Sequence, residues 1–360
     1  MVLPGASGPD ASTLAPPRTS APSRERLVAL DGLRGIAALS VLVFHYTFRS
    51  AQLFPRLGAP WAPGSWGYYG VALFFVISGF VIFLSLQGSS PRRFVLSRAI
   101  RLYPIYWVAA ILTFAVVTAV RLPGRQVTPL QALANLPLVE QLWGGAMIDP
   151  VYWTLAIEGV FYLVVGVLYF SGALRGRALP VTLLLWLVVV TAIGGTARVL
   201  GLAVGQGFAA GFLLAVDWMP LFVLGICFYL LWSGTLRLVV GITAALAIVA
   251  AMLTLSDPRL TVVLPMIGAL MAVALWGPQH LLGNRALSHL GEVSYPLYLT
   301  HQNLGYVVLL LLASLNLPRL VGITLTGVVA LLLATTLTFL VDRPLRRFLR
   351  RRLLQIDTVE

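Results

Sequence analysis

Long runs of apolar residues, separated by short polar segments, fill most of the chain. Each run is long enough to cross a hydrocarbon core of about 30 Å at about 1.5 Å per residue of helix. The sixth run is the weakest, because Asp217 and Pro220 interrupt it. The predicted spans are 33–54, 66–87, 101–120, 150–170, 179–200, 208–232, 236–255, 259–277, 292–314 and 320–341.

This pattern predicts an all-α, polytopic integral membrane protein with about ten transmembrane helices and no extra soluble domain. Only helices and closed barrels satisfy the backbone polar groups in lipid, and barrel strands would alternate over segments of about 10 residues. Residues 1–27 are polar and hold five prolines without an apolar signal segment, so we expect a disordered cytoplasmic tail. Residues 28–345 form the predicted membrane domain, and 346–360 a basic cytoplasmic tail on anionic lipid.

The composition excludes several classes of protein. Hydrophobic residues make up 59% and charged residues 10% of the chain, against about 25% charged residues in a soluble domain. All 25 basic residues are arginines, and the lack of lysine excludes a Walker A loop, a Schiff-base enzyme and a lysine-dependent kinase. One cysteine, Cys227, and no His-Glu-x-x-His motif argue against a disulfide framework and a metal enzyme. We expect no metal and no tightly bound cofactor.

The net charge of +13 lies mostly beside the apolar runs, which is typical of membrane edges and argues against a nucleic-acid partner. When alternate loops are assigned to opposite sides, 18 arginines fall on the side of both termini and 7 on the other. Arginine excess marks the cytoplasmic side. The sequence therefore predicts a multi-pass protein of the cell membrane, in contact with lipid, with both termini in the cytoplasm.

Arg34 and His45 lie eleven residues apart in the first span. Eleven residues make close to three helical turns, so both side chains share one face, with Arg34 at the rim and His45 roughly 16 Å deeper. Ionisable groups inside a span are costly and usually functional. The alternative is a topology anchor and a hydrogen-bonded packing residue.

Glu158 in the fourth span lies at about the same depth as His45. A carboxylate paired with the imidazole would hold one tautomer and raise its basicity. A structural link from Glu158 to an arginine or a tyrosine is the alternative. His301 is a second candidate acid–base group, on a polar stripe with Ser294 and Tyr298 at positions i, i+4 and i+7.

Arg98 and Arg101 are neighbours on the third span and make a fork suited to phosphates, although positive-inside topology explains them equally well. Ser78 and Tyr298 are further candidates for substrate contacts. Ser78 and Gly79 form a small pair at mid-depth that also suits close helix packing, and Ser78 lacks a nucleophile elbow.

Five motifs occur in order along almost the whole chain. Together they resemble the acyltransferase family 3 of membrane proteins, the O-antigen O-acetylase type. They are 30–38 with His45, 74–80, 98–104, 153–162 and 294–301. The chain departs from many members after Glu158, where Gly159 and Val160 replace an acid and a glutamine.

The resemblance implies a transmembrane acyltransferase domain over 28–345. It implies transfer of an acyl group, usually acetyl, from cytoplasmic acyl-CoA to a hydroxyl of a surface glycan or a macrolide-type metabolite. In the mechanism that we expect, His45 removes the hydroxyl proton, Glu158 orients the imidazole, and Arg34, Arg98 and Arg101 hold the CoA phosphates. An acyl-histidine intermediate is a variant. A proton-coupled transporter or flippase is the alternative function, since buried His, Glu and Arg serve proton relays equally well.

Overall fold

The computed structural model describes residues 24–138, 145–201, 208–235 and 237–354, which form helices and no strand. Nine helical segments among these residues are long and apolar enough to cross a membrane, and α10 is a shorter apolar helix of 17 residues. The predicted ten spans are thus nine long helices and one short one. The helices of these ten spans are α1 (Arg24–Val43), α3 (Gly70–Leu86), α4 (Pro91–Ala119), α6 (Trp153–Phe170), α7 (Leu179–Val199), α8 (Phe208–Trp232), α9 (Arg237–Leu255), α10 (Leu260–Trp276), α12 (Arg285–Ser314) and α13 (Arg319–Leu337).

The short elements lie between and after these helices. They are α2 (Ser50–Leu53), α5 (Pro129–Asn135), α11 (Gln279–Leu282) and α14 (Arg343–Leu354), two π-helical turns at Phe44–Arg49 and Thr338–Asp342, and 3-10 turns at Pro55–Leu57, Ala62–Tyr69, Pro150–Tyr152 and Gly176–Ala178.

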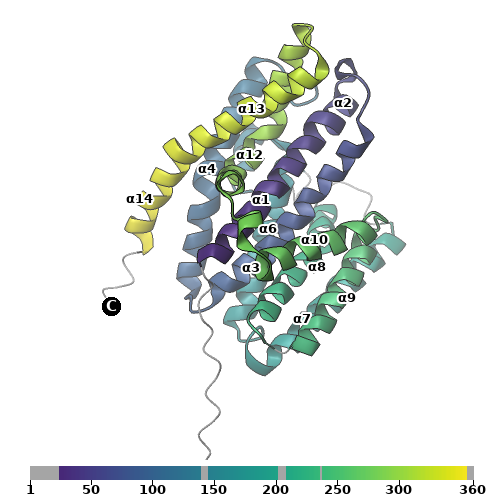
Figure 1. The fold of residues 1–360 in the computed structure, drawn as a ribbon, viewed down its shortest axis with the longest axis vertical. Coiled ribbons are helices and arrows are strands. Elements are labelled where there is room, and N and C mark those ends of the chain that lie inside the picture. The colour runs from purple at the N-terminus through teal and green to yellow at the C-terminus, as the bar shows by residue number, and fades with distance from the viewer. Residues whose placement is uncertain (1–23, 139–144, 202–207, 236, 355–360) are drawn as a thin grey trace, which may run out of the picture.

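The two ends of the bundle are named as follows. Helix α1 begins and α14 ends at one end, which we call the terminal face, and α2 lies at the other end, the far face (Figure 1).

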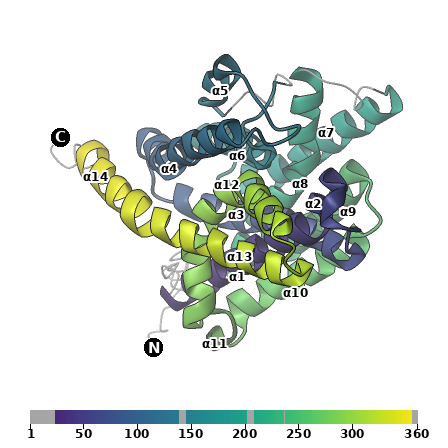
Figure 2. The same cartoon turned by 90° about the horizontal axis from the view of Figure 1, so that it is seen from above.

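Two boundaries differ from the sequence prediction. Helix α1 begins at Arg24, four residues before the predicted domain, and residues 1–23 and 355–360 lie outside the described residues. The predicted basic tail begins inside α14, which continues α13 through the π turn at Thr338–Asp342 (Figure 2). An arginine-rich helix that keeps apolar residues on one face suits a membrane surface, where the sequence analysis expects a basic tail on anionic lipid.

Glycines let the central helices approach each other closely. A Cβ atom at Gly35 would meet Leu290 and Gly291 of α12, which fixes α1 against α12. A Cβ atom at Gly79 of α3 would clash with the carbonyl of Phe222 on α8, and one at Gly225 would clash with the carbonyl of Val76. The predicted close packing at Gly79 is therefore confirmed, as membrane helices use small residues for such contacts.

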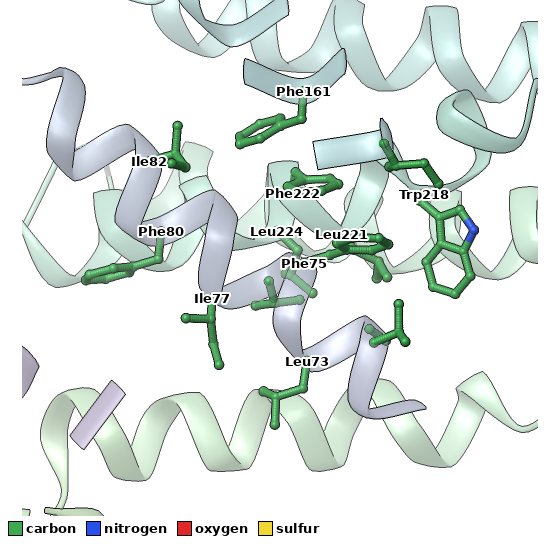
Figure 3. Packing of buried hydrophobic residues seen from close by; sticks show 14 of the residues in the cluster. Leu73, Phe75, Ile77, Phe80, Ile82, Phe161, Trp218, Leu221, Phe222 and Leu224 are labelled. Carbon is green, nitrogen blue, oxygen red and sulfur yellow. The ribbon is translucent and has the colours of Figure 1, made fainter. Parts of the chain in front are cut away.

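Aromatic and branched side chains fill the space between α3, α6 and α8 (Figure 3). Phe222 stacks on Phe161 with ring centroids 4.2 Å apart and lies 4.6 Å from the ring of Phe75. This apolar layer supports α3 and α6 from behind, so that Ser78 and Glu158 face the polar interior of the bundle.

Candidate active site

His45 lies in the π-helical turn Phe44–Arg49 at the end of α1. Such turns release backbone carbonyls from the regular helix pattern and occur often at functional sites. Polar side chains of this region bond back to the helix: His45 Nδ1 to the Val41 carbonyl at 2.8 Å, and Thr47 Oγ1 to the Val43 carbonyl at 2.7 Å. The π turn therefore carries a histidine whose ring is held by its own helix.

The second partner of His45 is His301 of α12. The distance from His301 Nε2 to His45 Nδ1 is 3.1 Å, and the two ring centroids lie 4.7 Å apart in an edge-on arrangement. Both rings are buried, with 8% of His45 and 1% of His301 exposed. The neighbouring Tyr46 donates to the His301 carbonyl at 2.8 Å, with its ring against Gly305, which fixes the two helices in this register.

The hydrogen bonds assign the tautomers of both rings. His301 Nδ1 lies 2.9 Å from the Tyr298 carbonyl and must carry a proton, which leaves Nε2 of the neutral ring as an acceptor. His45 Nδ1 faces a carbonyl and this acceptor, so it also carries a proton and donates to both. Within the described residues, every hydrogen bond of His45 uses Nδ1. Nε2 of His45 is then the unprotonated nitrogen, the form that a general base requires.

Glu158 does not pair with His45, so the expected partner of the imidazole is wrong. Glu158 Oε1 accepts hydrogen bonds from Ser78 Oγ at 3.0 Å and Tyr162 Oη at 2.6 Å. Equal depth does not bring two helices together: α1 packs along α12, whereas Glu158 of α6 turns toward α3. The partner of His45 is therefore His301, the other histidine that the sequence singled out.

A cavity of about 620 Å³, the terminal cavity, opens at the terminal face. Arg34, Arg101 and Arg285 line it, together with Arg346, which forms an ion pair with Asp342. Arg98 does not line this cavity; its Nε donates to Ser97 at 3.3 Å and its guanidinium lies 5.8 Å from the centre of the Phe94 ring. The predicted arginine cluster thus keeps Arg34 and Arg101 and gains Arg285 and Arg346.

Two further cavities continue from the terminal cavity into the bundle. The middle cavity, of about 60 Å³, is lined by Arg34, Ser78, Glu158, Tyr295 and Tyr298. Arg34 and Tyr295 line both the terminal and the middle cavity. The middle cavity is narrow, and it holds the predicted residues Arg34, Ser78, Glu158 and Tyr298 in one place.

The far cavity, of about 260 Å³, contains the histidine. Its wall includes His45, Arg49, Arg125, Trp153 and Tyr298. Val71 and Tyr298 line both the middle and the far cavity, so the three cavities follow one another from the arginine-rich rim to the imidazole. Thr154 Oγ1 donates to Tyr298 Oη at 2.8 Å, which fixes this shared wall. Arg34 and His45 thus line one series of cavities, as their spacing on the first span predicts.

A buried polar cluster beneath the histidines escaped the sequence analysis. Asp149 is fully buried, and its carboxylate accepts from the backbone N–H of Asn303 at 3.0 Å and of Val151 at 3.2 Å. Burial raises the pKa of Asp149 to about 7, against the opposing effect of these two hydrogen bonds. The cluster ties the start of α6 to α12 two residues after His301. Asp149 sits in a loop before a span, where apolar periodicity gives no signal.

Asp217, which interrupts the sixth predicted span, forms an ion pair with Arg198 at 3.0 Å and so links α8 to α7. No cluster of three or more metal-ligating side chains occurs among the described residues.

Comparisons with known proteins point to one family. A family model described as an acyltransferase domain matches residues 27–343. Protein 2 in the picA locus of Rhizobium radiobacter is 34% identical over 150 residues, 39% of this chain and 73% of that protein. The exopolysaccharide production protein ExoZ of Rhizobium meliloti (strain 1021) is 34% identical over 141 residues, 35% of this chain and 41% of ExoZ.

A third relative, the peptidoglycan O-acetyltransferase OatA of Listeria monocytogenes, is 29% identical over 168 residues, 41% of this chain and 25% of OatA. The match therefore spans less than half the length of ExoZ and of OatA. No solved structure matches the chain.

Proposed function

This chain belongs to the acyltransferase family 3, and from that premise we propose that it moves an acetyl group from cytoplasmic acyl-CoA to a hydroxyl of a carbohydrate. The observation that carries the proposal is the His45–His301 pair at the end of a series of cavities that begins among arginines. Acyl-CoA is a substrate in this account, and the chain's own residues supply the remaining chemistry.

The donor binds in the terminal cavity. Guanidinium groups bind phosphate oxygens in a forked geometry, and Arg34, Arg101 and Arg285 line this cavity. The excess of arginines beside this face supports a cytoplasmic location, where acyl-CoA is available. The thioester arm extends through the narrow middle cavity past Glu158 and Tyr298 to His45.

The reaction needs one base and one leaving group. Nε2 of His45 takes the proton of the acceptor hydroxyl while that oxygen attacks the thioester carbonyl. The tetrahedral intermediate collapses, its C–S bond breaks, and the imidazolium returns the proton to the departing sulfur. His301 accepts the Nδ1–H of His45 and stabilises the imidazolium, the part that an aspartate plays in a serine-protease triad.

The acceptor is a glycan in this proposal. Two relatives support it through their names: ExoZ is an exopolysaccharide production protein, and OatA a peptidoglycan O-acetyltransferase. The far cavity is lined by Tyr68 and Trp153, and aromatic faces suit the apolar face of a sugar ring. A macrolide-type metabolite is a different hydroxyl compound that the experiment below can include.

The test is acetyl transfer by the purified protein. Mass spectrometry follows the acceptor in the presence of acetyl-CoA, and the variants are His45→Gln and His280→Gln. His280 is an exposed histidine on α11 and serves as the control. We expect His45→Gln to lower the rate by about 10²–10⁴-fold, the usual contribution of a general base, and His280→Gln to have no effect. Unchanged transfer in His45→Gln, or solute movement in vesicles without transfer, would contradict the proposal and favour a transporter.

A further inference from the structure

Two arginines of the far face line the cavity that contains His45. The sequence places seven arginines beside this face, and three of them have structural partners. Arg198 pairs with Asp217, Arg259 donates to Ser65 Oγ at 3.3 Å, and Arg319 donates to the carbonyls of Ala59 and Thr47. Arg49 and Arg125 instead face the far cavity.

These two guanidinium groups have no carboxylate partner among the residues that the structure describes. Arg49 Nη1 donates to Gln52 at 3.1 Å, and within the described ranges neither Arg49 nor Arg125 forms an ion pair. The described residues that line the far cavity include no Asp or Glu. The pKa of Asp149 is raised by burial and lowered by the charge of Arg125, but Asp149 is fully buried, and its oxygens accept hydrogen bonds from the backbone of Val151 and Asn303.

The same cavity offers groups for the rest of a sugar. Tyr68 and Trp153 present aromatic surface, and His45, Arg49 and Arg125 line the same cavity. Two cations at the mouth of a cavity bind carboxylate or phosphate strongly, because guanidinium groups make paired, charge-assisted hydrogen bonds to such oxygens. A hydroxyl and an anionic group of one molecule can thus be held at once.

We propose that the acceptor is an anionic glycan, whose carboxylate or phosphate is bound by Arg49 and Arg125 while one of its hydroxyls meets His45. The inference rests on the proposed function for the role of His45. The anion-binding part stands on Arg49 and Arg125 alone.

The experiment compares three acceptors with one ring: methyl glucuronide, methyl glucoside 6-phosphate and neutral methyl glucoside. Acetyl transfer from acetyl-CoA is measured for the wild-type protein, for the double variant Arg49→Gln with Arg125→Gln, and for Arg121→Gln. Arg121 is an exposed arginine beside the same face and outside the far cavity, so it is the matched control. Binding is measured separately without donor, by the shift in melting temperature that each glycoside produces.

We expect the wild-type protein and Arg121→Gln to use an anionic glycoside with a kcat/KM about tenfold or more above that of methyl glucoside, since hydrogen bonds to charged groups are strong. The double variant should lose this advantage, so that its kcat/KM no longer depends on the charge of the glycoside. A preference for the glucuronide or for the phosphate then identifies which anion the acceptor carries.

Equal use and equal binding of all three glycosides by the wild-type protein would overturn the inference while leaving the proposed function in place. An advantage that survives in the double variant would overturn it too. Binding of an anionic glycoside that needs both arginines, with no acetyl transfer to any acceptor, would support the anion site and count against the proposed function.

Discussion

The proposed chemistry depends on which ring nitrogen of His45 carries the proton. Val41 and His301 both hold that proton on Nδ1, so the basic lone pair is on Nε2 of a ring that lines the far cavity. Sequence reasoning identified both histidines but assigned the wrong partner to His45. Helical spacing fixes depth and face on one helix, whereas the choice between Glu158 and His301 depends on how separate helices pack.

Removal of the His301 ring, which positions His45, should slow the reaction and leave the binding of acetyl-CoA intact. His301→Phe fills the space without an acceptor for the Nδ1–H of His45, and we expect kcat to fall about 10–100-fold, as for other residues that orient a catalytic group. His301→Gln keeps an acceptor oxygen and should recover part of the loss. The KM for acetyl-CoA should not move in either variant. A raised KM with unchanged kcat would show that His301 shapes the cavity only.

Substitutions of the two arginines of the third span should have different effects on the KM for acetyl-CoA. Arg101 lines the terminal cavity and Arg98 does not. We expect Arg101→Gln to raise the KM for acetyl-CoA about tenfold or more, since a hydrogen bond to a charged group contributes about 1.5–3 kcal/mol. Arg98→Gln is the matched control and should change it little. Equal effects of both variants would remove the terminal cavity as the phosphate site.

Elements position these residues through a π turn and glycine contacts. The shared face of Arg34 and His45 follows from regular helix geometry, and it holds because the π turn begins only at Phe44. The turn itself has no sequence signal, and neither does the loop that carries Asp149. The small pair Ser78 and Gly79 predicted close helix packing, but the partner helix became known only from the packing of α3 on α8.

The α3–α8 contact can be tested with a single methyl group. Gly79→Ala would push a Cβ atom into the backbone of Phe222, and such overpacking usually costs about 1–3 kcal/mol of stability. Gly268→Ala in α10 meets no atom within 4 Å and is the control. We expect a lower melting temperature in detergent for Gly79→Ala only. Equal melting temperatures would mean that the two helices do not touch at Gly79.

At the scale of the whole molecule, buried charge makes stability depend on pH. The pKa of Asp149 is raised to about 7 in the folded protein, above its usual value of 3.8, so the folded state binds the proton more tightly than the unfolded state. Its contribution is therefore fully present in acid and is lost as pH rises through about 7. Melting temperatures should fall as the pH rises from about 4 to about 7 and should level off above that.

Asp149→Asn should flatten this fall. Asp31 is an exposed carboxylate at the terminal face, and Asp31→Asn should leave the fall unchanged. The measurement is a thermal melt of the purified protein in detergent at each pH. A pH dependence that persists in Asp149→Asn would assign it to other groups.

In the proposed function, the terminal cavity binds the donor and the far cavity, which His45 lines, binds the acceptor. The most direct measurement of this account is acetyl transfer in sealed vesicles that hold the protein in one orientation, with acetyl-CoA on one side and the glycan on the other. We expect product when acetyl-CoA meets the terminal face and the glycan meets the far face, and none when the two are exchanged. Equal transfer with both substrates confined to one face would contradict it.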